Sequence, residues 1–129
     1  MGRAGAPTNV VDAGALIAFD RGDARARRYF QRSRENGFRL VIPAAVLAQV
    51  WRDAARQVNL ASLVRDACTV EPLDEQRAKA AGILCGRSGT ADIADASVVL
   101  AARIHRGLVV SSDPDDLRRI DPSIEVESL

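Results

Sequence analysis

The chain has 129 residues, of which 47% are hydrophobic and 27% are charged, so it is typical of one globular domain spanning residues 1–129 and not of a disordered chain. Its formal net charge of +1 excludes the overall basic field of a generic DNA-binding protein. Cys68 and Cys85 stand alone, so we expect free thiols and no disulfide framework or zinc site. The sequence shows neither the apolar run of a signal peptide nor a membrane-spanning stretch, so we expect a cytoplasmic protein without a membrane partner.

In chain order, apolar runs and turn residues predict alternating strands and helices. We expect strands at residues 9–11, 38–43, 68–72, 108–112 and 123–128, helices at 13–19, 24–35, 44–56, 58–67, 74–86, 91–105 and 113–120, and a loop at 86–89. This alternation predicts an α/β fold. The strands are continuous apolar runs, which fits a parallel sheet covered on both faces. In such sheets, functional sites form at the carboxyl ends of the strands.

Four aspartates stand at the ends of these predicted elements. Asp12 follows the strand NVV, and Asp113 follows the strand LVVSS. Asp92 and Asp95 lie three residues apart in the first turn of a predicted helix, so they share one face. If the two strands are neighbours in the sheet, three or four carboxylates meet at one edge.

Each aspartate also has a simpler interpretation. Asp113 precedes Pro114, which is typical of a helix N-cap, and Asp92 suits the positive end of a helix dipole. Asp12 fits a turn, whereas Asp95 is followed by the apolar run ASVVLAA and should face inward. Together, however, the carboxylates would repel one another unless a cation joined them. An all-oxygen ligand set favours Mg²⁺ or Mn²⁺, which can activate water to hydrolyse a phosphodiester.

Other chemistries find little support in the sequence. The single histidine, His105, lies in the last turn of a predicted helix, where we expect it to interact with the helix dipole. Ser111 and Ser112 have no general base nearby in sequence, although Ser112 beside Asp113 is a candidate contact for a metal water or a phosphate.

The segments VVDAGALIA, IPAAVLAQVWRD, GTADIADASVVLAA and VVSSDPDDL together resemble the PIN domain family, and specifically the VapC-type toxin ribonucleases. The resemblance runs in the right order over nearly the whole chain. It implies a three-layer α/β/α sandwich with a mostly parallel five-stranded sheet. It also implies metal-dependent hydrolysis of single-stranded RNA.

By position, the resemblance assigns catalytic roles to Asp12, Asp95 and Asp113, and metal ligation to these three together with Asp92. The implied cofactor is Mg²⁺ or Mn²⁺. The family usually carries Glu on the third helix, where this chain has Gln49. Gln keeps an oxygen donor but loses the charge. Gln49 is therefore either a tolerated site contact in an active nuclease or a mark of reduced activity.

The resemblance further implies three partners: an RNA substrate, a cognate VapB-type antitoxin, and a second copy in a homodimer built on helix faces. Val46, Val50 and Trp51 are candidates for exposed apolar surface, with core packing as the alternative. Five arginines crowd residues 24–35, where they form either a solvated face or a surface for RNA phosphates or antitoxin acids: Arg25, Arg27, Arg28, Arg32 and Arg34.

Two other functions remain open. The first is a catalytically weakened PIN-like domain that acts by binding RNA or protein, which the glutamine at position 49 motivates. The second is a phosphatase on a similar sandwich. It has less support, because Asp12 is followed by Ala-Gly-Ala and not by a second aspartate.

Overall fold

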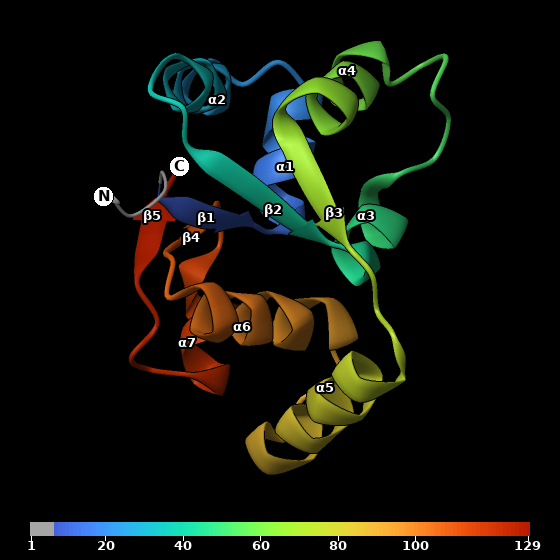
Figure 1. Cartoon of the computed structure of the whole chain (residues 1–129), viewed down its shortest axis with the longest axis vertical. Coiled ribbons are helices and arrows are strands. Elements are labelled where there is room, and N and C mark those ends of the chain that lie inside the picture. The colour runs from blue at the N-terminus through green and yellow to red at the C-terminus, as the bar shows by residue number, and fades with distance from the viewer. Residues whose placement is uncertain (1–6) are drawn as a thin grey trace, which may run out of the picture.

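The structure is a computed structural model that describes residues 7–129. Five strands form one sheet in the order β3-β2-β1-β4-β5, and every neighbouring pair is parallel (Figure 1). The strands are β1 (Thr8–Val11), β2 (Arg39–Pro43), β3 (Cys68–Glu71), β4 (Val109–Ser111) and β5 (Val126–Ser128). The predicted α/β fold with a parallel sheet is confirmed.

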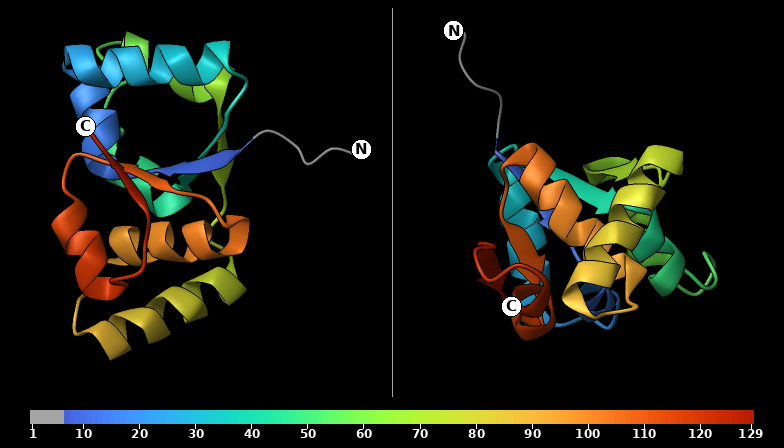
Figure 2. Two further views of the ribbon diagram at one scale, coloured as in Figure 1. Left: turned by 90° about the vertical axis from the view of Figure 1, so that its left-hand side faces the viewer. Right: turned by 90° about the horizontal axis from the view of Figure 1, so that it is seen from below.

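Seven helices are found in the described part of the chain. They are α1 (Ala13–Asp20), α2 (Ala24–Glu35), α3 (Ala44–Val50), α4 (Val58–Ala67), α5 (Glu75–Ser88), α6 (Ile93–His105) and α7 (Pro114–Ile120). Helices α1, α2 and α4 lie on one side of the sheet, and α5, α6 and α7 lie on the other (Figures 1 and 2). None of the described helices is long and apolar enough to cross a membrane.

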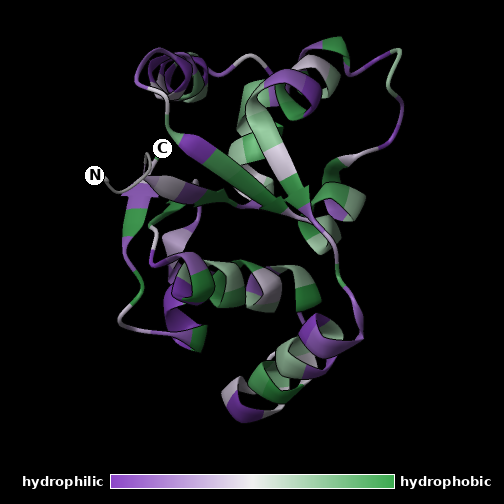
Figure 3. Cartoon of the chain, in the orientation of Figure 1, coloured by the Kyte–Doolittle hydropathy of each residue, from purple (hydrophilic) through white to green (hydrophobic). Residues whose placement is uncertain are grey.

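The two central strands form the middle of the core. Val10 and Val11 of β1 and Val109 and Val110 of β4 are fully buried, and the pairs align in register. Colouring by hydropathy shows the hydrophobic residues gathered on the strands and along α6 (Figure 3). Because β1 and β4 are parallel neighbours, their carboxyl ends finish at the same edge of the sheet.

Two candidates for exposed apolar surface belong to the core instead. Val46 and Val50 are only 0% and 6% exposed, because α3 turns this face toward the sheet. Trp51 is half-buried and also packs against the core. Of the two interpretations of Val46 and Val50, core packing is therefore confirmed and an exposed patch is excluded.

The helix predicted for residues 44–56 ends early, at Val50. Trp51 adopts an extended backbone, and the side chain of Gln57 binds the turn that follows. Its Oε1 accepts from the backbone N–H groups of Arg52 (2.7 Å) and Asp53 (3.0 Å). Its Nε2 donates to the carbonyl of Val50 (2.9 Å). This one side chain satisfies the backbone groups that a continuing helix would have paired.

Two smaller boundaries also differ from the prediction. Residues 86–88, expected in a loop, complete α5, and only Gly89 (φ 72°) adopts the left-handed conformation that ends the helix. The last strand is limited to Val126–Ser128, because Ile124 donates its N–H to Asp121 in a turn (3.2 Å).

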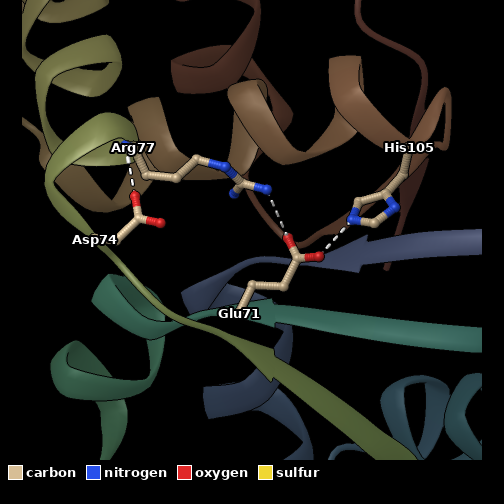
Figure 4. A network of polar contacts seen from close by, with 4 residues as sticks. All are labelled: Glu71, Asp74, Arg77 and His105. Atoms are coloured by element: carbon tan, nitrogen blue, oxygen red, sulfur yellow. Dashed lines mark hydrogen bonds and ion pairs between the residues drawn. The ribbon is translucent and has the colours of Figure 1, made fainter.

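His105 has a specific acidic partner in addition to its place at a helix end. Its Nε2 lies 2.6 Å from Oε2 of Glu71, at the carboxyl end of β3. Oε1 of the same carboxylate accepts from Arg77 of α5 (3.3 Å), and Asp74 caps that helix (Figure 4). The network ties α5 and the end of α6 to the outer strand β3, which a dipole interaction alone would not do.

Replacing Gln57 tests its role in ending α3. Gln57→Ala removes the contacts to Val50, Arg52 and Asp53, and we expect the free energy of unfolding to fall by about 1–2 kcal/mol in urea titrations. As a matched control, Gln31→Ala removes one exposed bond to Glu35 and should cost less than about 0.5 kcal/mol. Equal losses for the two variants would contradict this role.

Candidate functional site

Asp12 is placed by the end of β1. Its backbone N–H donates to Val110 of β4 (3.2 Å), and its side chain caps α1 by accepting from the N–H of Ala15 (2.9 Å). The residue is only 5% exposed. Burial raises the pKa of Asp12, hydrogen bonds from Ser111 and Ala15 oppose the shift, and the nearby charge of Asp113 adds to it.

Asp113 is placed by the end of β4. Its backbone N–H donates to Oγ of Ser111 (2.9 Å), and its own side chain makes no capping hydrogen bond at the start of α7. Ser111 is fully buried, so its hydroxyl lies between the two strand ends and contacts both acidic residues. The N-cap position predicted for Asp113 is confirmed, while its carboxylate stays exposed.

Asp92 and Asp95 open α6. Asp92 is the N-cap, and its Oδ1 accepts from the N–H of Asp95 (2.9 Å). The side chain of Asp95 is half-buried, next to the buried Ala94 and Ala96. Asp92 therefore caps α6 and also lies close to a second acidic residue.

The charges of these aspartates converge on Asp95. Burial and then the charges of neighbouring carboxylates raise the pKa of Asp95 to about 7. In order of effect, these neighbours are Asp92, Asp116, Asp12 and Asp113. We call the five aspartates the acidic rim. The four acids expected from the sequence therefore share one electrostatic neighbourhood.

Asp116 is the member of the acidic rim that the sequence analysis missed. It lines one shallow pocket with Asp92, Asp95 and Arg119, and its Oδ1 lies 3.4 Å from Nη1 of Arg119 in an exposed ion pair. The signal was available, because Asp113 and Asp116 repeat the three-residue spacing of Asp92 and Asp95 at the start of a helix.

The acidic rim suits a hard cation by its chemistry. Its donors are all carboxylate oxygens, and crowding of like charge is the cost that a divalent ion would relieve. Within residues 7–129, no three Asp, Glu, His or Cys side chains are already grouped closely enough to hold a metal ion. Binding would therefore require the exposed carboxylates of Asp92, Asp113 and Asp116 to turn toward Asp12 and Asp95.

Gly14 and Ser112 are in close contact beside Asp12. A Cβ at position 14 would collide with Oγ of Ser112 in its present position, so a larger residue there would force this exposed hydroxyl to move. Ser112 is exposed and therefore open to a ligand at the rim. Its predicted contact with a metal water or a phosphate stays a prediction.

Gln49 lies apart from the pocket of the acidic rim. It is exposed on α3 and lines a different pocket, with Asp20, Arg21 and Gln57 among its neighbours. None of the five rim aspartates lines that pocket. Asp12 and Asp113 line neither of these two pockets.

A comparison with protein families finds the PIN domain model over residues 10–122. The chain belongs to the PIN domain family. PIN domains are generally nucleases. A comparison with curated protein sequences finds no significant match.

Solved structures share this fold at low sequence identity. A VapBC2 complex from Rickettsia felis, bound to a DNA fragment from its promoter, matches with a TM-score of 0.70 and 12% identity, over 95% of this chain and 98% of the other. PAE2754 from Pyrobaculum aerophilum matches with a TM-score of 0.64 and 17% identity, over 94% of this chain and 91% of the other. FitAcB from Neisseria gonorrhoeae matches with a TM-score of 0.58 and 14% identity, over 92% of this chain and 95% of the other.

The raised pKa of Asp95 predicts that this residue destabilises the metal-free fold at neutral and higher pH. Because its folded pKa lies above its ordinary value of 3.8, its favourable contribution is present in acid and is lost as pH rises toward about 7. After allowance for solvent screening of this half-buried group, we expect Asp95→Asn to gain about 1–2 kcal/mol of unfolding free energy at pH 8.

This gain should shrink toward zero at pH 4, measured by urea unfolding with EDTA present. Asp115→Asn, on the same acidic stretch but outside the rim, is the control and should change stability by less than about 0.5 kcal/mol at both pH values. A loss of stability in Asp95→Asn at pH 8 would contradict the charge crowding.

Proposed function

We propose that this protein is a metal-dependent endoribonuclease, the toxin of a VapBC-type toxin–antitoxin pair, which cleaves single-stranded regions of RNA in the cytoplasm. The observation that carries the proposal is the convergence of five carboxylates around Asp95, at the carboxyl edge of the sheet of a PIN domain. Four carboxylates whose charges all act on the half-buried Asp95 fit a cation site better than capping alone.

In this proposal, Asp12, Asp92, Asp95 and Asp113 hold Mg²⁺ or Mn²⁺. When bound, the cation supplies charge stabilisation at the phosphate and activates a water molecule. The chain's own contribution is to fix the ligands. The hydrogen bond from Ala15 holds Asp12, and the backbone contact with Ser111 fixes the start of the Asp113 turn. Asp12 is thus held in place before an ion binds, whereas the exposed carboxylates of Asp92 and Asp113 must turn toward it.

The proposed partners are an RNA substrate, a VapB-type antitoxin and a second copy of the chain in a homodimer. Support for the antitoxin comes from the fold, which is shared with proteins solved as VapBC2 and as FitAB, each bound to DNA. A neighbouring reading frame for a small DNA-binding protein would be consistent with this assignment.

The alternative of a weakened or silent nuclease rests on Gln49. The five carboxylates of the acidic rim are all present without a contribution from position 49, which supports a tolerated substitution. We therefore expect Gln49→Glu to change the cleavage rate by no more than about twofold, where the alternative expects a large gain.

Cleavage of single-stranded RNA by antitoxin-free protein, in Mg²⁺ or Mn²⁺, tests the proposal. We expect wild-type protein to cleave, and Asp95→Asn to lose at least about 100-fold in rate because a metal ligand and its charge are removed. Asp115→Asn is the matched control, since it removes the same charge from the exposed side of α7 and should cleave as wild type does.

Unchanged cleavage by Asp95→Asn would overturn the proposed site. Cleavage gained only in Gln49→Glu would favour the silenced alternative. Circular dichroism of each variant should match wild type, so that a lost activity is not a lost fold.

A further inference from the structure

Helix α2 concentrates the positive charge of the chain. With five Arg and one Glu, Ala24–Glu35 carries a formal charge of +4, and the remaining 13 basic and 16 acidic residues give the rest of the chain −3. The helix stands out as hydrophilic at the outer face of the molecule (Figure 3). The net charge of the chain is therefore close to zero although its charges are separated. Helix α2, in one helical layer, is basic, and the acidic rim lies at the edge of the sheet.

Three of these arginines line one groove. Arg25, Arg28 and Arg32 line it from α2, and β5 with the residue after it lines it as well. We call this the basic groove. Its other lining residues are Tyr29, Ser33, Asn36, Phe38, Glu127, Ser128 and Leu129.

The arginines of the basic groove have free guanidinium groups. All three are exposed, and within residues 7–129 none of them forms an ion pair. The only acidic side chain lining the groove is Glu127. Along the helix axis the arginines rise by about 4.5 Å and then about 6 Å, so they form a row of separate cationic forks.

Phe38 adds an aromatic face to the same groove. It is only partly buried and is not packed against the hydrophobic core of the described residues, unlike Tyr29. The hydroxyl of Tyr29 accepts a hydrogen bond from Nδ2 of Asn9 (2.8 Å), so Tyr29 is held in place as part of the groove's lining. A partly exposed aromatic ring beside a row of arginines is the combination used to bind single-stranded nucleic acid, by stacking and phosphate contacts.

The basic groove ends at strand β5, which pairs with the strand that leads to Asp113. Leu129, which lines the groove, donates its backbone N–H to the carbonyl of Ser111 (2.9 Å). The hydroxyl of Ser111 in turn accepts from the N–H of Asp113. These contacts run through the sheet, because Ser111 is fully buried, and the pocket of Asp92, Asp95 and Asp116 shares no lining residue with the groove.

We propose that the basic groove binds a single RNA strand, with Arg25, Arg28 and Arg32 on its phosphates and Phe38 on a base. This inference rests on the proposed ribonuclease function and names a surface, outside the acidic rim, that holds its substrate. An acidic protein segment would use the arginines equally well but would leave the aromatic face without a role. The groove thus matches RNA more fully.

Binding of a labelled oligouridylate, measured by fluorescence anisotropy in EDTA, tests the groove without any need for cleavage. Arg28→Gln/Arg32→Gln should weaken binding about tenfold and make the slope of log K against log salt shallower by about 1.4, because each lost phosphate contact removes about 0.7 from the slope for single strands. Arg27→Gln/Arg34→Gln removes the same charge from the other side of α2 and should bind within about twofold of wild type.

Phe38→Ala separates stacking from charge. It should weaken binding about fivefold or more while leaving the salt slope unchanged, since a base–aromatic contact carries no charge. Equal losses in the two arginine pairs, or no binding by wild type, would overturn the proposal. So would polyglutamate binding that depends on Arg28 and Arg32 while oligouridylate binding does not, since this would assign the groove to an acidic protein.

The same variants distinguish this inference from the proposed function. If Asp95→Asn stops cleavage but the groove variants bind and cleave as wild type does, the proposed ribonuclease function is supported and the proposed RNA binding by the groove is refuted. If the groove variants lose RNA binding while neither wild type nor any variant cleaves RNA, RNA binding by the groove is supported and the ribonuclease function is refuted.

Discussion

The in-register parallel pairing of β1 with β4 is the constraint on which the acidic rim depends. Val10 and Val11 face Val109 and Val110 in adjacent strands, so both strands stop at the same level of the sheet. Residues 12 and 113 then turn into helices at one edge. Both strands are buried on both faces, so hydrophobic packing on either side of the sheet fixes this pairing and with it the positions at which residues 12 and 113 leave the sheet.

The energetic cost of this arrangement falls on Asp95, which is half-buried and surrounded by four other carboxylates. A domain selected for stability alone would not retain such a cluster, because like charges near a buried acid destabilise the fold at neutral pH. Contacts elsewhere in the chain stabilise the fold. The Glu71 network holds α5 and the end of α6 to β3, and Gln57 holds the turn after α3. Stored electrostatic strain at one edge of a well-packed sheet is typical of a functional site.

Sequence patterns predicted the parallel sheet and the four principal acids, because strand ends and helix starts are marked by local residue types such as the apolar run before Asp12. They missed Asp116, whose role depends on how α7 packs beside α6. They extended α3 to residue 56, because the contacts of Gln57 with the preceding turn are tertiary and leave no periodic signal. They left both core packing and an exposed patch open for Val46 and Val50, since an apolar helix face looks alike whether it meets the core or a partner.

Thermal unfolding in rising Mg²⁺, at pH 8 and constant ionic strength, tests most directly whether the acidic rim is a cation site. Because the ion would bind only the folded state, the Tm of wild-type protein should rise by several degrees once Mg²⁺ reaches about 100 times its dissociation constant. Asp115→Asn should follow wild type, and Asp95→Asn should start higher and rise little. A wild-type Tm that does not respond to Mg²⁺, or an equal rise in Asp95→Asn, would contradict the account.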